Sequence, residues 1–503
     1  MRRENEYIIV QAGGKGTRLG DFTKNRAKCL VNIDGKPMLS LLAETFKEYN
    51  IIVIGDYKID NLRKYIAKFH PGIMLVEAEG KGTNSGVVQA LEHVPDDSRV
   101  TIIWSDLIFQ SGIPDIATTG NTIGLSRTFD CRYQYESNTI VKRTGNTNGI
   151  AGFFSFSNKS ELTSIPDSGS LVSGWMVDKG IRFDNIIWLD NVVEIGTVTA
   201  LREYEQPKQH CRFFNSVKRV GNKIIKKAVV DKYNTLLDRE YKWYTDVNKI
   251  SGVNVPTSEF IQKENTLILD FIDGKHPYDL DYQTQREVLV KIGESFDKLH
   301  SSSYRPGIRN DIQSMYFDKL STRVRPYSSI IHQYEKEYIN INGSMYKNPF
   351  YKDELDNFYK KLYSLDTKKF TPIHGDPTFS NMLWDGRDIW FIDPRGAFGS
   401  EEYSLYGDPA YDWAKLYYSA IDNYDNINLR DFDITILENE TLIEFNNINQ
   451  DIFWEICPIA REKIQLILCS IWFSLVGYVI EDTDAMNFAF AKGVITYNDR
   501  NSL

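Results

Sequence analysis

Residues 371–396, TPIHGDPTFSNMLWDGRDIWFIDPRG, place the strongest constraint on this 503-residue chain. Two short apolar runs, 370–373 and 389–392, frame the stretch, and their β-branched and aromatic residues predict two strands. Four polar side chains stand between and after these runs: His374, Asp376, Asn381 and Asp393. They therefore fall on a loop and at the end of a strand, where a rigid scaffold can present them to a ligand.

The chemistry of these side chains favours phosphoryl transfer. Asp376 can accept a proton from an alcohol, and Asn381 and Asp393 offer the oxygen ligands that Mg²⁺ prefers. A positioned base and metal ions that neutralise phosphates are the parts that this reaction needs. A polar hairpin made of turn residues is the alternative interpretation.

The order H-G-D-x4-N, an apolar run and then I-D-P-R-G resembles the aminoglycoside phosphotransferase/choline kinase family, and the resemblance covers roughly residues 213–480. It implies that Asp376 is the catalytic base and that Asn381 and Asp393 bind Mg²⁺. The family also has the element YGDPAYDWAKL, residues 406–416. We expect Asp408 and Asp412 to cap and orient the catalytic loop, with a direct substrate contact as the alternative.

Length and composition bound the rest of the chain. A chain of 503 residues exceeds what one hydrophobic core usually supports, so two or more domains are expected. Its net charge of −9 argues against general nucleic-acid binding, and its five scattered cysteines form no C-x-x-C pair that would indicate a zinc site. The longest apolar run, 464–480, is short for a membrane span and is expected to be a buried helix, and the N-terminus lacks a signal-peptide layout. We expect a cytoplasmic enzyme.

A glycine-rich loop opens the chain. The apolar run 7–10 leads into QAGGKGTRLG, in which glycines let backbone N–H groups approach phosphate oxygens while Lys15 and Arg18 add positive charge. The spacing fits neither a Walker loop nor G-x-G-x-x-G. Further on, NRAKCLVNIDGKPML carries Lys28, a turn at Asp34-Gly35 and a helix that begins near Pro37.

These two segments together resemble the sugar-nucleotide pyrophosphorylase family, which includes the choline-phosphate cytidylyltransferases. The resemblance covers roughly residues 5–205, with Ala27 where the family usually has proline. It implies that Arg18 and Lys28 contact the phosphates, and that the loop holds the nucleotide. The implied nucleotide-binding residues are Ala12, Gly13, Gly14, Lys15, Gly16, Thr17, Gly82 and Thr83; the last two lie in GKGTNSGVVQAL, which resembles the family's base-recognition segment.

Alternating strand and helix patterns follow the glycine-rich loop. Strands are expected at 51–54, 73–76 and 99–104 and a helix at 61–69, which together predict a mostly parallel, doubly wound sheet. Ligands bind at the carboxyl ends of such strands, where Asp106 is a natural Mg²⁺ ligand, although capping of a turn is the alternative. The resemblance implies a second acidic ligand in E-I-G-T, where Glu194 replaces the usual aspartate and Asp190 is the fallback.

The second domain is predicted to begin like a kinase lobe. Residues 213–229 alternate as a hairpin that turns at Gly221-Asn222, and its second strand carries Lys226 and Lys227. One lysine should hold nucleotide phosphates and pair with Glu240 of the helix 238–248. The family pattern favours Lys226, and a solvent-facing lysine is the alternative for one of the two. A strand at 266–272, a helical insertion or lid at 327–363 and a helical remainder after 416 are also expected.

The sequence thus predicts a Rossmann-like nucleotidyltransferase domain at 1–206 and a two-lobed, protein-kinase-like α+β phosphotransferase domain at 210–503. The second domain would phosphorylate a small alcohol with ATP and Mg²⁺. The first would transfer a nucleotide, CMP from CTP by preference, to that phosphate and release pyrophosphate, giving a precursor for surface polysaccharide or lipid. The alternatives are a sugar 1-kinase joined to a UTP- or GTP-dependent transferase, antibiotic phosphorylation, and one active domain beside a regulatory or scaffolding one. No nucleic-acid partner and no membrane span are expected, and homo-oligomerisation stays open.

Overall fold

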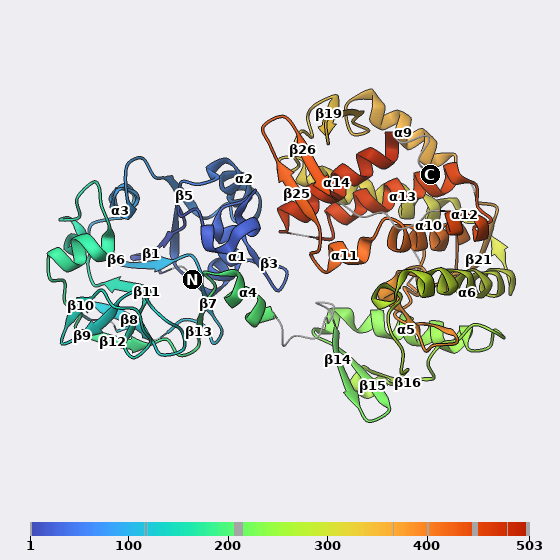
Figure 1. The fold of residues 1–503 in the computed structure, drawn as a ribbon, viewed down its shortest axis with the longest axis horizontal. Coiled ribbons are helices and arrows are strands. Elements are labelled where there is room, and N and C mark those ends of the chain that lie inside the picture. The colour runs from blue at the N-terminus through green and yellow to red at the C-terminus, as the bar shows by residue number, and fades with distance from the viewer. Residues whose placement is uncertain are drawn as a thin grey trace. The chain divides into compact units, whose positions relative to one another are not determined.

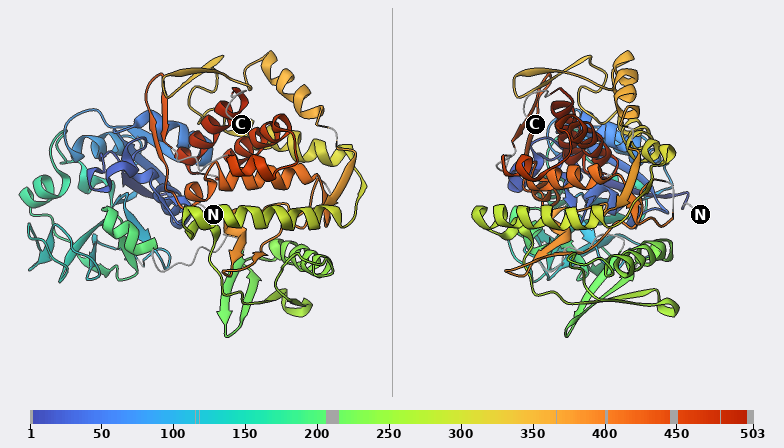
Figure 2. Two further views of the ribbon diagram at one scale, coloured as in Figure 1. Left: turned by 45° about the vertical axis from the view of Figure 1, so that its right-hand side comes forward. Right: turned by 90° about the vertical axis from the view of Figure 1, so that its right-hand side faces the viewer.

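The computed structural model describes residues 3–114, 116–117, 119–205, 215–365, 367–399, 402–444, 451–479 and 481–498. The chain divides into two compact units, residues 1–207 and 208–503, which are described separately below (Figures 1 and 2).

A nine-stranded mixed sheet forms the centre of the first unit (Figure 1). Its parallel part has the order β6-β1-β4-β5, and antiparallel strands extend it beyond β6. The strands are β1 (Glu6–Gln11), β4 (Asn50–Gly55), β5 (Met74–Glu77), β6 (Arg99–Trp104), β8 (Thr122–Ser126), β9 (Gln134–Glu136), β10 (Thr139–Val141), β11 (Gly149–Phe156) and β12 (Asn185–Trp188). The doubly wound fold predicted from the sequence is confirmed, with its strands within a residue or two of the expected positions.

Both faces of this sheet are buried. Ile8 and Val10 of β1 pack into one core cluster, whereas Ile9 packs into another on the opposite face. The continuous apolar runs of the sequence follow from this double coverage, because a strand covered on both faces needs no polar side. Four α-helices accompany the sheet: α1 (Met38–Thr45), α2 (Ile59–Phe69), α3 (Thr83–Leu91) and α4 (Val198–Glu205).

The strand order places a ligand site at the end of β1. The chain runs from β1 to β4 on one side and later returns to β6 on the other side, so β1 is the point at which the winding direction reverses. Loops diverge at such a point and leave a crevice at the carboxyl ends of the strands. The glycine-rich loop follows β1 there, and a small ribbon of β7 (Leu107–Phe109) and β13 (Val192–Glu194) continues from β6. A second ribbon pairs β2 (Asn32–Ile33) with β3 (Lys36–Pro37).

A four-stranded antiparallel sheet of order β14-β15-β17-β16 begins the second unit, with helix α5 packed against it (Figure 1). The bounds are β14 (Asn215–Val220), β15 (Lys223–Ala228), α5 (Asn234–Val247), β16 (Ser258–Ile261) and β17 (Thr266–Asp270). The described part of the expected hairpin, its turn and the expected helix and strand are therefore all present; residues 213 and 214 lie outside the described residues.

The larger part of the second unit is mostly helical. Its principal helices are α6 (Tyr282–Ser301), α9 (Asp353–Tyr363), α10 (Pro409–Ala420), α13 (Arg461–Val476) and α14 (Thr483–Asn498), and its shorter ones are α7 (Arg309–Gln313), α8 (Lys319–Arg323), α11 (Tyr424–Asn428) and α12 (Asp451–Ile456). Helices α10, α13 and α14 pack in succession. The motif stretch 371–396 overlaps two small sheets. One sheet is formed by β18 (Arg305–Pro306), β21 (Lys369–Pro372) and β24 (Tyr406–Gly407), and the other by β22 (Met382–Trp384) and β23 (Ile389–Phe391).

The expectation of a wholly helical insertion and remainder is wrong for two segments. Strands β19 (Tyr338–Ile341), β20 (Ser344–Lys347), β25 (Asp433–Ile436) and β26 (Thr441–Glu444) join in a four-stranded sheet. Asn342 and Gly343 turn the first hairpin with φ of 50° and 75°, the positive angles that the common two-residue Asn-Gly turn requires. The alternation of apolar residues in DITI and TLIE is likewise a strand pattern. None of the described helices is long and apolar enough to cross a membrane.

We predict that fragments 1–206 and 210–503 each fold alone, because each unit has its own sheets and its own buried apolar residues. Each fragment should melt cooperatively within about 4 °C of a transition of the full chain, since losing a few boundary contacts shifts the Tm by only that much. Calorimetry and circular dichroism measure this. Insoluble fragments beside a soluble full chain would contradict independent domains.

Candidate active sites

The glycine-rich loop of the first unit leaves β1 at Ala12, whose buried N–H donates to the carbonyl of Ile54 (2.9 Å). Lys15, Thr17 and Arg18 then lie exposed. Gly16 has a φ of 64°, and a Cβ there would lie 2.9 Å from Cγ2 of Thr23. Glycine is therefore required at this bend, which leaves the following residues open to a ligand.

Two carboxylates converge beside this loop. Asp106 follows β6, and Glu194 ends β13 opposite Leu107 of β7. The ribbon of β7 and β13 is joined to Asp106 by a hydrogen bond, in which the N–H of Ile195 donates to the Asp106 carbonyl (2.8 Å). Pairing of β7 with β13 thus brings together two acids that are 88 positions apart in the chain.

Each of these carboxylates has a cationic partner. Nζ of Lys28 contacts Oδ2 of Asp106, and Nη2 of Arg18 lies 3.4 Å from Oε1 of Glu194. Burial and the charge of Asp106 raise the pKa of Glu194, while Lys28 and Arg18 oppose that shift. A divalent cation would relieve the repulsion between the two acids, so the pair fits the Mg²⁺ ligand set expected from the sequence.

The other nucleotide-binding residues predicted for this unit lie on two loops. Gly13 and Gly14 continue from Ala12, and at Gly14 the space around the backbone is open. Gly82 precedes α3 with a φ of 87°, and the hydroxyl of Thr83 accepts the N–H of Leu171 (2.9 Å). The structure therefore ties segment 82–83 to residues 169–171.

The two departures from the family pattern have simple structural settings. Ala27 is buried with φ −62° and ψ 151°, the backbone that proline would adopt at this position. Asp190 lies exposed in the turn before β13, so the structure brings Glu194 and not Asp190 beside Asp106. Sequence reasoning missed Gly196: a Cβ there would lie 2.1 Å from Oε1 of Glu194 and 2.9 Å from Nη2 of Arg18. Gly196 thus makes room for the longer acid.

A buried ion-pair network defines the site of the second unit. Nζ of Lys226 lies 2.7 Å from Oε1 of Glu240 and also contacts Oδ1 of Asp393. Burial lowers the pKa of Lys226, but the charges of Asp393 and Glu240 outweigh burial and leave that pKa raised. Tyr244 donates its hydroxyl to Glu240 (3.2 Å) and accepts the N–H of Asp393 (3.0 Å). The network links β15, α5 and the catalytic stretch.

Strand alternation separates the two lysines of β15. Lys226 is buried, whereas Lys227 is exposed and pairs with Glu264 (3.2 Å). On α5 the buried residues Leu237, Glu240, Tyr244 and Val247 recur at helical spacing, so a carboxylate occupies a core-facing position. A buried charge needs a partner, and Lys226 supplies it.

The candidate base Asp376 lies in the loop after β21. Nδ2 of Asn381 donates to the Asp376 carbonyl (2.7 Å) and to its Oδ2 (3.2 Å). Nζ of Lys415, on α10, lies 2.9 Å from Oδ1 of Asp376. Sequence reasoning missed Lys415, although a lysine three positions after Asp412 in an apolar helix was a signal that it shares a buried face with that residue.

Asp412 holds the catalytic loop in place. Its carboxylate accepts the backbone N–H groups of His374 and Gly375 (both 2.8 Å) and lies 3.1 Å from Nε2 of His300. Burial lowers the pKa of His374, whose neutral ring donates from Nε2 to the Ile392 carbonyl (3.0 Å) and accepts the Asp376 N–H at Nδ1 (3.3 Å). These bonds fix the backbone that leads into the base.

Asp408 has a purely internal position. It is fully buried, caps α10 through the N–H of Ala410 (3.0 Å), and pairs with Lys463 (3.0 Å). The capping and orienting role that the sequence favours for Asp408 and Asp412 agrees with these contacts.

Asp393 and Asn381 are the remaining candidate metal ligands. Asp393 has a φ of 54°, a strained angle for a residue other than glycine, and such strain often occurs at functional sites. Within the described residues, no group of three or more His, Cys, Asp or Glu could hold a metal ion alone. Mg²⁺ is usually bound by one or two carboxylates together with substrate phosphates, so both ligand pairs suit that mode.

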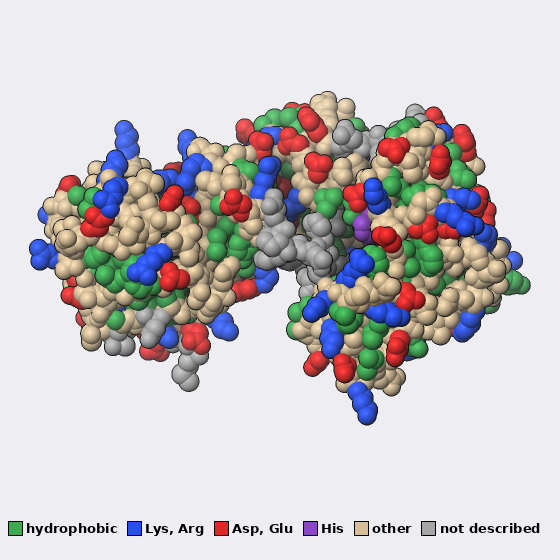
Figure 3. All heavy atoms as spheres, turned by 60° about the horizontal axis from the view of Figure 1, so that its bottom comes forward, with side chains coloured by type: hydrophobic (Ala, Val, Ile, Leu, Met, Phe, Trp, Pro, Cys, Tyr) green, Lys and Arg blue, Asp and Glu red, His purple; other side chains and the backbone are tan. Residues whose placement is uncertain are grey.

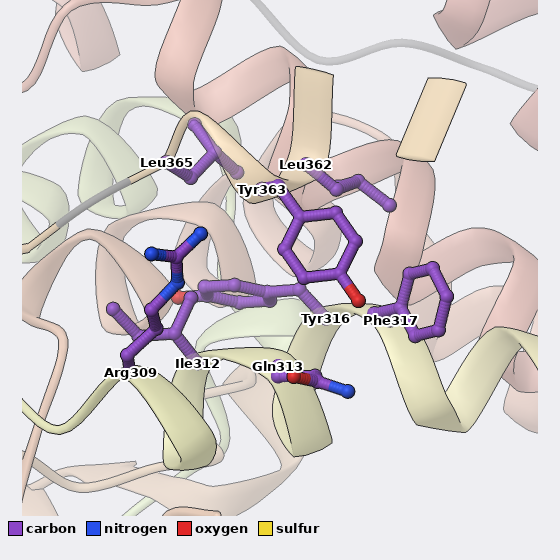
Figure 4. Close-up of a pocket in the computed structure, with 8 residues that line it drawn as sticks. All are labelled: Arg309, Ile312, Gln313, Tyr316, Phe317, Leu362, Tyr363 and Leu365. Carbon is purple, nitrogen blue, oxygen red and sulfur yellow. The ribbon is translucent and has the colours of Figure 1, made fainter. Parts of the chain in front are cut away.

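A well-formed pocket of the second unit lies away from these residues (Figure 4). Figure 4 shows aromatic rings and leucine side chains around it, with Arg309 and Gln313 as polar neighbours. Its lining is Arg309, Ile312, Gln313, Tyr316, Phe317, Leu362, Tyr363 and Leu365. It contains none of the residues that carry the predicted chemistry.

Comparisons with known proteins follow this division into two units. Residues 8–113 match the family model described as MobA-like NTP transferase domain, and residues 215–435 match the model described as Phosphotransferase enzyme family. The bifunctional protein GlmU of Methanocaldococcus jannaschii is 36% identical over 110 residues, which are 21% of this chain and 26% of that protein. GlmU of Methanococcus maripaludis is 30% identical over 159 residues, which are 31% of this chain and 37% of that protein. The chain thus spans well under half of these relatives.

Three solved structures are similar to 40–42% of the chain. The CTP:phosphocholine cytidylyltransferase LicC of Streptococcus pneumoniae has a TM-score of 0.34 at 19% identity over 99% of its own chain. HddC of Yersinia pseudotuberculosis has a TM-score of 0.34 at 20% identity over 99% of its own chain. The inositol-1-phosphate CTP transferase of T. maritima has a TM-score of 0.31 at 17% identity over 100% of its own chain. The family matches thus identify a MobA-like NTP transferase domain within the first unit and a phosphotransferase-family domain within the second.

Proposed function

We propose that this protein is a bifunctional enzyme that phosphorylates a small alcohol with ATP and then transfers a nucleotidyl group to the new phosphate. One observation carries the proposal: each unit contains its own cluster of paired lysine and carboxylate side chains, formed by residues to which the family resemblance assigns phosphate and metal binding. A kinase whose product is the acceptor of the attached transferase is the economical reason for joining the two. The product would be an activated precursor for surface polysaccharide or lipid.

In the kinase reaction, the alcohol oxygen attacks the γ-phosphorus of ATP and Asp376 takes the hydroxyl proton as ADP leaves. Asn381 fixes Asp376 through two hydrogen bonds, and Asp412 fixes the backbone before it. Lys226 is placed to neutralise ATP phosphates, with Glu240 holding its ammonium. Asn381 and Asp393 would hold Mg²⁺, which neutralises charge on the phosphates when bound.

In the nucleotidyl reaction, an oxygen of the alcohol phosphate attacks the α-phosphorus of CTP and pyrophosphate leaves. An anion approaches an anion, so the rate depends on charge neutralisation. Arg18 and Lys28 supply positive charge from this chain, and the glycine-rich loop offers backbone N–H groups. Asp106 and Glu194 would hold Mg²⁺. CTP is our first choice on the family resemblance, and UTP or GTP with a sugar 1-phosphate is the alternative.

The structure gives little support to an inactive first unit. That alternative rests on Ala27 and Glu194, yet Ala27 has the backbone geometry of proline and Glu194 lies beside Asp106. Mass spectrometry of the full chain with ATP, each NTP in turn and a library of amino alcohols, alditols and sugars tests the proposal. A nucleoside-diphosphate-linked alcohol is the expected product, and its absence with every NTP would reject the second activity.

Exchange of Lys226 for Ala should reduce the kcat/KM for ATP by at least about 100-fold, because it leaves Glu240 and Asp393 without their buried cation, at a cost of about 3–5 kcal/mol. Exchange of Lys227 for Ala is the matched control. Its exposed pair with Glu264 contributes at most about 1 kcal/mol, so the kinase rate should stay near wild type. Equal losses in both variants would contradict the role of Lys226.

Asp376→Asn should retain the fold and ATP binding but lower the phosphoryl-transfer rate by about 10²–10⁴, the usual effect of removing a general base. Asp388→Asn, a half-exposed aspartate of the same stretch, is the control and should be neutral. Rates come from ADP release with an accepted alcohol. A near-normal rate in Asp376→Asn would reject this base.

Asp106→Ala should abolish pyrophosphate release, by at least about 10²-fold, while kinase activity persists, because the two sites belong to separate units. Glu194→Ala should be nearly as severe, and Glu194→Asp should remain active. Asp190→Ala serves as the exposed control. A wild-type rate for Glu194→Ala would show that Glu194 is not the second metal ligand. Loss of kinase activity in Asp106→Ala would contradict two independent sites.

A further inference from the structure

Four cationic side chains from three segments form a cluster that reaches the candidate base of the kinase unit through Lys415. Lys415 of α10 pairs with Asp376 at 2.9 Å, and Arg395, from the loop after β23, donates to the hydroxyl of Tyr411 (3.5 Å). Lys319 of α8 lies 5.6 Å from the centre of the same Tyr411 ring. Arg323, four residues after Lys319, completes the group, which we call the cation cluster: Lys319, Arg323, Arg395 and Lys415.

The cation cluster has an excess of positive charge. Within the described part of the chain, Lys415 is the only member that forms an ion pair with a carboxylate. Asp425 lies near Asp376, but it is buried and accepts the N–H of Ser380 (3.2 Å) and the hydroxyl of Ser419. The surface in Figure 3, by contrast, intersperses acidic and basic side chains. The excess of positive charge is therefore a feature of the surroundings of Asp376.

Burial, and after it repulsion from the other cations, disfavours the charged form of Lys319, and a bound anion would favour that form again. Burial, with the charges of Arg395, Arg323 and Lys415, holds the pKa of Lys319 well below its usual range. Burial and Arg395 likewise lower the pKa of Arg323. All four side chains remain partly accessible. Among the described residues, Asp376 is the carboxylate that pairs with this cluster, and it pairs with Lys415. An anionic ligand could add the charge that would relieve the remaining repulsion.

The aromatic rings around the base already have cationic partners. Lys319 lies over Tyr411, and Lys415 lies 5.0 Å from the ring centre of Tyr418 and 5.9 Å from that of Tyr424. A site for a quaternary ammonium needs open aromatic faces that attract the ligand's charge. Here the ammonium groups of Lys319 and Lys415 already lie over the faces of these rings. A cationic amino alcohol would therefore meet repulsion near Asp376.

The cluster is distinct from the cations that serve ATP in the proposed kinase reaction. Lys226 interacts with Asp393 and Glu240, whereas the cluster's charges act on Asp376 and on one another. A π-helical turn, Ser314–Asp318, directly precedes Lys319. Such a turn adds one residue and rotates the following side chains by about 100°, and π turns occur often at functional sites. The chain therefore departs from regular helix just before α8 supplies two of the four cations.

We infer that the alcohol phosphorylated at Asp376 is an anion, with a carboxylate or a phosphate that binds Lys319, Arg323, Arg395 and Lys415. This inference rests on the proposed kinase function and specifies its acceptor class. The hydroxyl would face Asp376, and the acceptor's charged end would lie among the cations. The hydroxyl oxygen of this acceptor would attack the γ-phosphorus of ATP, with the proton passing to Asp376 and ADP leaving.

A matched series of acceptors tests the inference with the full chain. Glucitol, gluconate, 1-amino-1-deoxyglucitol and glucitol 6-phosphate share a six-carbon polyol and differ at one end in charge. Calorimetric binding in the presence of Mg²⁺ and a non-hydrolysable ATP analogue, and ADP release with ATP, are measured separately. We expect gluconate or glucitol 6-phosphate to bind about 10–100-fold more tightly than glucitol, the range for one or two charge-assisted hydrogen bonds. The amine should bind most weakly.

Charge variants locate the effect. Lys319→Gln and Arg323→Gln should each lower the affinity for the anionic acceptor, relative to glucitol, about tenfold. The change should appear mainly in the KM for the acceptor, and the KM for ATP should stay unchanged. Lys319→Glu should invert the preference. Lys361→Gln is the matched control, because Lys361 also lies over a tyrosine ring, that of Tyr497, but is exposed outside the cluster.

The outcomes separate the two proposals. Selective binding of an anionic compound that the cluster variants abolish supports the inference. A preference for gluconate would indicate a carboxylate on the natural acceptor, and a preference for glucitol 6-phosphate would indicate a phosphate. Turnover without anion preference leaves the kinase function standing and overturns the inference, as does equal or absent binding of all four compounds. An equal fall of kcat for every acceptor in Lys319→Gln would assign the cluster to the transferred phosphoryl group and would also overturn it.

Discussion

A lysine ammonium held against an aspartate carboxylate occurs at each candidate site, and the local structure depends on these contacts. Removing a charge from water costs several kcal/mol, so a buried lysine needs a partner. The pairs are Lys28 with Asp106, Lys226 with Asp393, and Lys415 with Asp376. Each pair joins segments that are distant in sequence, so the ion pair holds together the elements that form the site.

The same contacts make the sites responsive to ligands. Asp393 and Asp106 are candidate Mg²⁺ ligands, and each now contacts a lysine that is also a candidate phosphate ligand. In the proposed reactions these carboxylates would hold Mg²⁺ and these lysines would neutralise phosphates. Without those ligands, each carboxylate and lysine compensate each other's charge.

Local patterns explain how much of the fold and the sites could be predicted. Strand alternation separates Lys226 from Lys227, and helical spacing places Glu240 on the buried face of α5. Both regularities depend only on neighbouring residues. The hairpin at 338–347 follows the same rules through Asn342-Gly343, although the tyrosine-rich composition of 327–363 favours a helical insertion or a lid. Composition averages over the segment and so does not register a two-residue turn signal.

Other features depend on contacts that no local pattern specifies. Gly196 matters because the longer side chain of Glu194 and the guanidinium of Arg18 meet over it. Lys415 reaches Asp376 only because Asp412, one turn earlier on α10, anchors the loop that carries the base. Tyrosines near a kinase base are likewise ambiguous in sequence, since an open ring attracts a cationic ligand and an occupied ring repels it. Lys319 and Lys415 lie over two of these rings, and the inferred preference for an anionic acceptor rests on these tertiary contacts and not on tyrosine content.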